Sequence, residues 1–151
     1  VIEITGRPFS ASLPRYEDIA PTVHIALRCE RRLLDKRINE RARAMFDGGL
    51  VEEVEALIDQ GIREGETAPR AIGYAQALAV IDGTMSVPEA VDSTALATRQ
   101  LASRQIKWFR RDPRLHWIDV ALTETGQCTD SERSRLTRQA WELVCAGRGV
   151  A

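Results

Sequence analysis

The chain has 151 residues, 44% of them hydrophobic and 28% charged, and its formal net charge is −1. This composition is typical of a globular protein with one core, and it excludes a global attraction to nucleic acid, so any such binding must come from a local patch. No apolar run approaches the roughly 18 residues of a membrane span. Three widely spaced cysteines and two histidines argue against a disulfide framework and a zinc site, and favour a reducing, cytoplasmic compartment.

The first residues predict the end of an element followed by a linker. Val1–Thr5 is apolar-periodic and Gly6 stops it, which is typical of the last turns of a helix. Prolines and serines in 7–21 predict a loop. Because the pattern starts within an element and Val1 is not a methionine, we expect the chain to be the C-terminal part of a longer protein.

The remaining sequence predicts a mostly α fold with two short strands. Alternating, β-branched segments indicate strands at 22–29 and 115–120. Helical periodicity, capping residues and glycine stops indicate the following helices: 30–47, 50–60, 69–82, 87–111, and a last one from 130 or 131 to about 146. Ser86 and Glu89 form a capping-box pattern before the fourth of these.

Arg41 occupies an unusual place on the first helix. At about 100° per residue it projects close to Leu34 and Met45, so it borders the face expected to point inward, and Arg37 lies one turn earlier. A guanidinium at the edge of a core needs an anionic partner. The partner is either a protein carboxylate such as Glu30, in a structural ion pair, or a phosphate or diphosphate held by the planar guanidinium.

A glycine interrupts the helical pattern of 69–82. Gly73 costs a helix interior up to about 1 kcal/mol relative to alanine, so its presence indicates that another part of the protein, or a ligand, approaches the backbone closely.

The segment Thr98–Pro113 (TRQLASRQIKWFRRDP) carries five basic residues and no acid before Asp112. On a helix, one stripe collects Gln100, Arg104, Lys107 and Arg111, hereafter the basic stripe, and Trp108 flanks it. Such a stripe can bind a polyanion and offer a stacking surface beside it. It can equally be the solvated face of an ordinary amphipathic helix.

Several strings together resemble one family, the tRNA dimethylallyltransferases, also called tRNA isopentenyltransferases. They are RINERARAMFDGGLVEEVEAL, PRAIGYAQ and TRQLASRQIKWFRRDPRLHWID, and VIEITGRPFS resembles the segment just before them. The resemblance covers roughly residues 1–120 and is of the bacterial type.

The resemblance implies an activity and a fold. These enzymes transfer a dimethylallyl group from dimethylallyl diphosphate to N6 of the adenine 3′-adjacent to the anticodon in tRNA. The chain would be the C-terminal part of a P-loop NTPase-like α/β fold. Residues 1–20 would end a helical insertion and form a linker, 21–146 would carry the tRNA-binding helices, and 147–151 would be a frayed tail.

The same resemblance implies what this chain lacks. The family uses a P-loop with Mg²⁺, which gives it its nucleotide-binding and ATP-binding character, and an aspartate as general base. The chain contains no G-x-x-x-x-G-K-[ST] motif. We therefore expect these 151 residues alone to be catalytically inactive.

Residue by residue, the family's diphosphate-binding arginine falls on Arg41, which becomes the predicted catalytic residue. The predicted tRNA-binding residues are Arg70, Ala71, Ile72, Gly73, Tyr74, Ala75, Ser103, Arg104, Gln105, Ile106, Lys107, Trp108, Phe109 and Arg110. Ala75 and Ser103 stand where many members carry a basic residue. The alternatives are a freestanding helical RNA-binding module without catalysis, and a purely structural helical domain.

Overall fold

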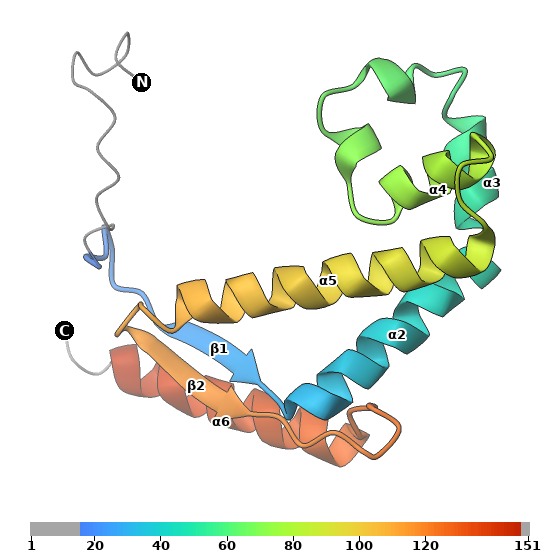
Figure 1. Ribbon diagram of the computed structural model, residues 1–151. Coiled ribbons are helices and arrows are strands. Elements are labelled where there is room, and N and C mark those ends of the chain that lie inside the picture. The colour runs from blue at the N-terminus through green and yellow to red at the C-terminus, as the bar shows by residue number, and fades with distance from the viewer. Residues whose placement is uncertain (1–15, 149–151) are drawn as a thin grey trace, which may run out of the picture.

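The structure is a computed structural model that describes residues 16–148. The predicted helix end and the predicted linker up to residue 15 lie outside these residues, as does the end of the tail. The fold is mostly helical with two short strands, as predicted (Figure 1). Its elements are β1 (His24–Arg28), α2 (Arg31–Asp47), α3 (Leu50–Ala56), η1 (Ile62–Glu64), η2 (Ala68–Arg70), α4 (Tyr74–Ile81), α5 (Val87–Phe109), β2 (Leu115–Asp119) and α6 (Asp130–Arg148).

The two strands pair with each other in parallel, from His24 opposite Leu115 to Arg28 opposite Asp119. The intervening helices form the long crossover that parallel strands require. At the end of the ladder Arg28 binds Asp119 through two hydrogen bonds, of 2.5 and 3.0 Å. Helix α6 lies against this small sheet, where Arg135 donates to the Asp119 carbonyl at 2.6 Å.

Helices α2 and α5 run antiparallel and connect the sheet to the core. Arg31 at the start of α2 contacts Ser103 late in α5, whereas Phe46 near the end of α2 shares the core with Ala90 at the start of α5. The core lies at the end of the molecule away from the sheet, where α2, α3, α4 and α5 meet (Figure 1). Its buried members are Phe46, Leu50, Val54, Ile62, Ala77, Leu78 and Ala90.

The single helix predicted for 69–82 is wrong, because the chain breaks at Gly73. Residues Ala68–Arg70 form one 3₁₀ turn, and α4 begins only at Tyr74. Gly73 is the N-cap of α4 with φ of +98°, a value that side-chain-bearing residues rarely adopt. The predicted close approach is confirmed, since a Cβ on Gly73 would lie 3.2 Å from the Met45 Cε.

We expect Gly73→Ala to lower the free energy of unfolding by about 1–3 kcal/mol, because alanine would be forced into a disfavoured backbone conformation against Met45. Gly83→Ala is the matched control, since Gly83 also has a positive φ but a Cβ added there would meet no atom within 4 Å. Urea denaturation should give the smaller loss for Gly83→Ala. If both variants lost the same free energy of unfolding, the contact with Met45 would contribute nothing to the loss.

The other boundaries differ by a few residues from those predicted. Helix α3 ends at Ala56 and continues as turns, and α5 ends at Phe109. The capping box before α5 is confirmed, since the Ser86 N–H and hydroxyl donate to Glu89 Oε2 at 2.8 and 2.6 Å. No helix within residues 16–148 is long and apolar enough to span a bilayer.

A small ion-pair network fixes the turn between α5 and β2. The Arg114 guanidinium donates to Asp112 and, at 2.5 Å, to Asp18. The hydrogen bonds from Arg114 hold the pKa of the Asp112 carboxyl at about 2. This network sets the direction in which the chain leaves the basic end of α5.

Candidate active site and nucleic-acid interface

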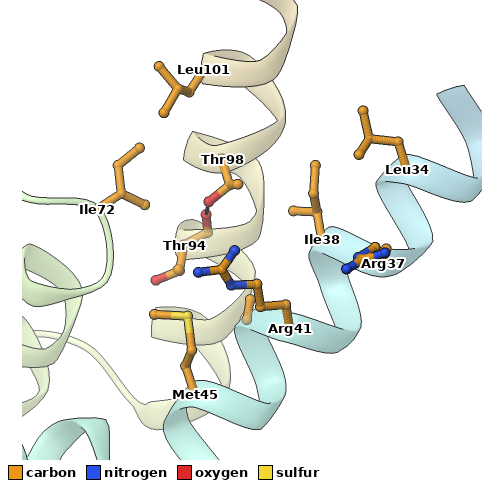
Figure 2. Close-up of a pocket in the computed structure, with 10 residues that line it drawn as sticks. Leu34, Arg37, Ile38, Arg41, Met45, Ile72, Thr94, Thr98 and Leu101 are labelled. Carbon is orange, nitrogen blue, oxygen red and sulfur yellow. Dashed lines mark hydrogen bonds between the residues drawn. The ribbon is translucent and has the colours of Figure 1, made fainter. Parts of the chain in front are cut away.

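A pocket of about 270 Å³ lies between α2, α5 and the segment before α4 (Figure 2). Arg37 and Arg41 are the charged residues that line it. The other lining residues are Leu34, Ile38, Ala42, Met45, Ile72, Thr94, Thr98 and Leu101. An apolar pocket with two guanidinium groups suits a ligand that has both an anionic and a small apolar part.

The amphipathic character of α2 places Arg41 at this pocket. Arg41 lies on the same side of α2 as Ile38 and Met45, which are half-buried and also line the pocket. Figure 2 shows the Arg41 side chain extending from α2 toward Thr94 on α5. Arg37 precedes it by one turn on the same side.

The structural ion pair considered for Arg41 does not form within residues 16–148. No described carboxylate lies within 4.0 Å of the Arg37 or Arg41 guanidinium nitrogens. Glu30, the suggested partner, contacts Arg32 at 3.2 Å instead. In this part of the chain both pocket arginines are therefore available to an anionic ligand.

The basic stripe is exposed along the second half of α5 and just beyond it. Arg104, Lys107 and Arg111 have no ion-pair partner among the described carboxylates. Arginines elsewhere do, for example Arg63 with Asp82 at 2.6 Å. Beside the stripe lies Trp108, a residue that is 58% exposed. Unpaired cations next to an exposed indole form the local patch that nucleic-acid binding would need.

Residues of the predicted string 70–75 reach the pocket and its rim. Ile72 lines the pocket beside Arg41, and Gly73 is buried against Met45. Arg70 and Ala71 are exposed. Tyr74 donates a hydrogen bond to Glu53, which raises the pKa of the Tyr74 phenol, and desolvation adds to the shift. Ala75 lies in the first turn of α4 and is half-buried.

The second predicted string, 103–110, is divided among different faces of α5. Ser103 faces α2 and accepts a hydrogen bond from Arg31 at 2.6 Å. A second apolar cavity, of about 490 Å³, lies beside the sheet and is larger than the pocket at Arg41. Its lining includes three residues of this string: Gln105, Ile106 and Phe109. Arg104, Lys107, Trp108 and Arg110 are exposed. A tRNA contact by these residues stays a prediction.

Sequence reasoning missed the α5 side of the pocket. Thr94, Thr98 and Leu101 line it, and Thr94 is 2% exposed. Threonines within an apolar-periodic helix give no sequence signal that separates a ligand contact from core packing. Only the antiparallel packing of α2 and α5 brings them to Arg41.

The donor set of the pocket does not suit a metal ion. Carboxylates are absent from its lining, and residues 16–148 contain no group of three or more His, Cys, Asp or Glu side chains that could hold a metal. The site is therefore a cationic and apolar one, in a mostly helical fold with a small parallel sheet.

Comparisons with known proteins give the family. Residues 1–112 match the family described as IPP transferase. The chain is 51% identical over 130 residues to the tRNA dimethylallyltransferase of Streptomyces avermitilis, covering 84% of this chain and 42% of that protein. It is 45% identical over 149 residues to that of Mycobacterium tuberculosis, covering 95% and 45%. The chain belongs to the IPP transferase family.

Solved structures agree. The tRNA isopentenylpyrophosphate transferase from Bacillus halodurans superposes with a TM-score of 0.71 at 29% identity, over 99% of this chain and 44% of that one. The enzyme from Staphylococcus epidermidis gives 0.63 at 30% identity, over 80% and 38%. The chain thus spans less than half the length of the relatives that it matches.

Proposed function

We propose that this chain is the C-terminal part of a tRNA dimethylallyltransferase. The complete enzyme transfers the dimethylallyl group of dimethylallyl diphosphate to N6 of the adenine 3′-adjacent to the anticodon in tRNA. The observation that carries the proposal is the apolar pocket lined by Arg37 and Arg41, next to Ile72 of the predicted tRNA string. A diphosphate bearing a short branched chain matches this combination of charge and apolar surface. The relatives at 45–51% identity support the same activity.

Arg41 would act on the leaving group. In the transfer, a bond forms between adenine N6 and the first carbon of the dimethylallyl group, and the bond from that carbon to the diphosphate oxygen breaks. Negative charge builds on the diphosphate as it leaves, and a guanidinium already in place stabilises this charge without reorganisation. The N6 proton passes to a general base outside the described residues.

The basic stripe and Trp108 would hold the RNA. The target adenine must leave its stack before N6 can be aligned with the reacting carbon, and phosphate contacts that fix the anticodon stem-loop would hold the flipped base in place. The cations of the stripe supply such contacts, and the exposed indole offers a surface for stacking.

Other features of the proposal concern the remaining length of the enzyme. Mg²⁺ would be held there, because the family resemblance places the phosphate loop in that part of the enzyme. The nucleotide-binding and ATP-binding character of the family would reside there too. A tRNA substrate places the enzyme in the cytoplasm.

Prenyl transfer to an unmodified tRNA transcript tests the proposal. A full-length protein containing this chain should transfer label from dimethylallyl diphosphate to tRNA, and the 151 residues alone should bind tRNA without transfer. Binding without transfer by the full-length protein would favour the RNA-binding module. If the full-length protein neither transfers label nor shifts the mobility of tRNA, the purely structural domain would be favoured. Transfer by the 151 residues alone would refute the need for a separate phosphate loop and base.

A further inference from the structure

Thr94 carries a buried hydroxyl that makes no hydrogen bond within residues 16–148. Its residue is 2% exposed, and Oγ1 is the buried side-chain polar atom without a partner in this part of the chain. Buried polar groups in native proteins are nearly always hydrogen-bonded, because leaving one unmet costs free energy. We therefore expect the Thr94 hydroxyl to form a hydrogen bond with a group that is not among the described residues.

Several other hydroxyls on the helices bind the carbonyl four residues earlier. Thr98 Oγ1 donates to the Thr94 carbonyl at 2.8 Å, and Thr137 Oγ1 donates to the Arg133 carbonyl at 2.9 Å. Thr94 does not make this local bond. Its side chain lies on the face of α5 that lines the pocket, across from Arg41 (Figure 2).

The pocket limits what the partner can be. Around Thr94 the lining is largely aliphatic, and its charged groups are the guanidiniums of Arg37 and Arg41, which donate but cannot accept. A ligand that enters between two such cations brings negatively charged oxygens. These are strong acceptors for a neighbouring hydroxyl.

We propose that Thr94 is a further substrate-binding residue, whose hydroxyl donates a hydrogen bond to an oxygen of the diphosphate that Arg41 neutralises. The inference rests on the proposed function for the identity of the diphosphate ester. It adds a neutral donor, on α5, to the cationic donors on α2. The ligand would thus bridge the two helices whose packing forms the pocket.

This role predicts opposite effects on stability and binding. Valine has nearly the shape of threonine and carries no polar atom, so Thr94→Val relieves the unmet hydroxyl in the free protein and should not lower its melting temperature. The same change removes a bond to a charged ligand, which should weaken binding roughly tenfold or more. A purely structural hydroxyl would behave in the reverse way, with loss of stability and unchanged binding.

The experiment uses the full-length protein and two readouts. Calorimetric titration with inorganic diphosphate gives the dissociation constant, and steady-state kinetics give KM for dimethylallyl diphosphate. Thr94→Val should raise both, and Thr94→Ser, which keeps the hydroxyl, should stay closer to the wild type. Thr137→Val is the matched control, because its hydroxyl is bonded to a carbonyl on α6, and it should change neither.

Two results would overturn the inference: an unchanged dissociation constant for diphosphate in Thr94→Val, or a lower melting temperature with unchanged binding. Failure of the proposed function looks different. If the wild type transfers no prenyl group to tRNA, that function is wrong, whereas the diphosphate titration still decides the role of Thr94.

Discussion

Arg41→Ala should lower turnover by about two to three orders of magnitude in a full-length enzyme that contains this chain, while tRNA affinity stays unchanged. Loss of one preorganised group that stabilises charge developing in the transition state typically costs this much. Arg41 lines an apolar pocket and has no described carboxylate partner, so its charge is available to an anionic ligand. Single-turnover transfer to tRNA measures the chemical step, and filter binding measures the tRNA affinity.

Arg43→Ala is the matched control for this prediction. Arg43 lies two residues further along α2 and is exposed, as Arg41 is, but it does not line the pocket. The same loss of one positive charge there should leave turnover close to that of the wild type. If Arg41→Ala turned over normally, or if both variants fell equally, Arg41 would have no special role in the transfer.

Local sequence patterns predict most of the helices and strands. They do not predict how these elements pack against one another. Periodicity predicts the helices because each buries one side, as α2 does with Ala42 and Phe46. The pairing of the strands carries no local signal, since Arg28 and Asp119 lie far apart in the chain. The glycine at position 73 marks the place where the predicted helix breaks, but the helical periodicity around it gives no sign of its positive φ.

Of the two helices that line the pocket, the sequence predicted a pocket residue only on α2. Arg41 could be selected from its position at the border of an amphipathic face, and the family resemblance gave it a ligand. Thr94 could not be selected, because its relevance depends on α5 packing antiparallel to α2 and on an unmet hydroxyl that only the structure reveals. Ser103 illustrates the same limit, since its bond with Arg31 turns it toward α2 rather than toward solvent.

Reversing charge on the basic stripe should weaken tRNA binding and make it less dependent on salt. With a net charge of −1 the chain has no global attraction to RNA, so affinity depends on local cations that displace counterions from phosphates. Lys107→Glu should reduce the slope of log affinity against log salt by about one, and Arg104→Glu with Lys107→Glu by about two. The affinity for tRNA should fall several-fold at low salt and less at high salt. At high salt the phosphate contacts that the substitution removes are already screened.

The matched control places the same charge change on another helix. Arg138 on α6 is exposed and has no ion-pair partner among the described residues, so Arg138→Glu alters net charge equally without touching the stripe. Titrations of labelled tRNA at several salt concentrations should show the wild-type slope for this variant. An unchanged slope for Lys107→Glu would return the stripe to an ordinary solvated face. Equal reductions for Lys107→Glu and Arg138→Glu would mean that overall charge, rather than contact with phosphates at α5, governs the binding.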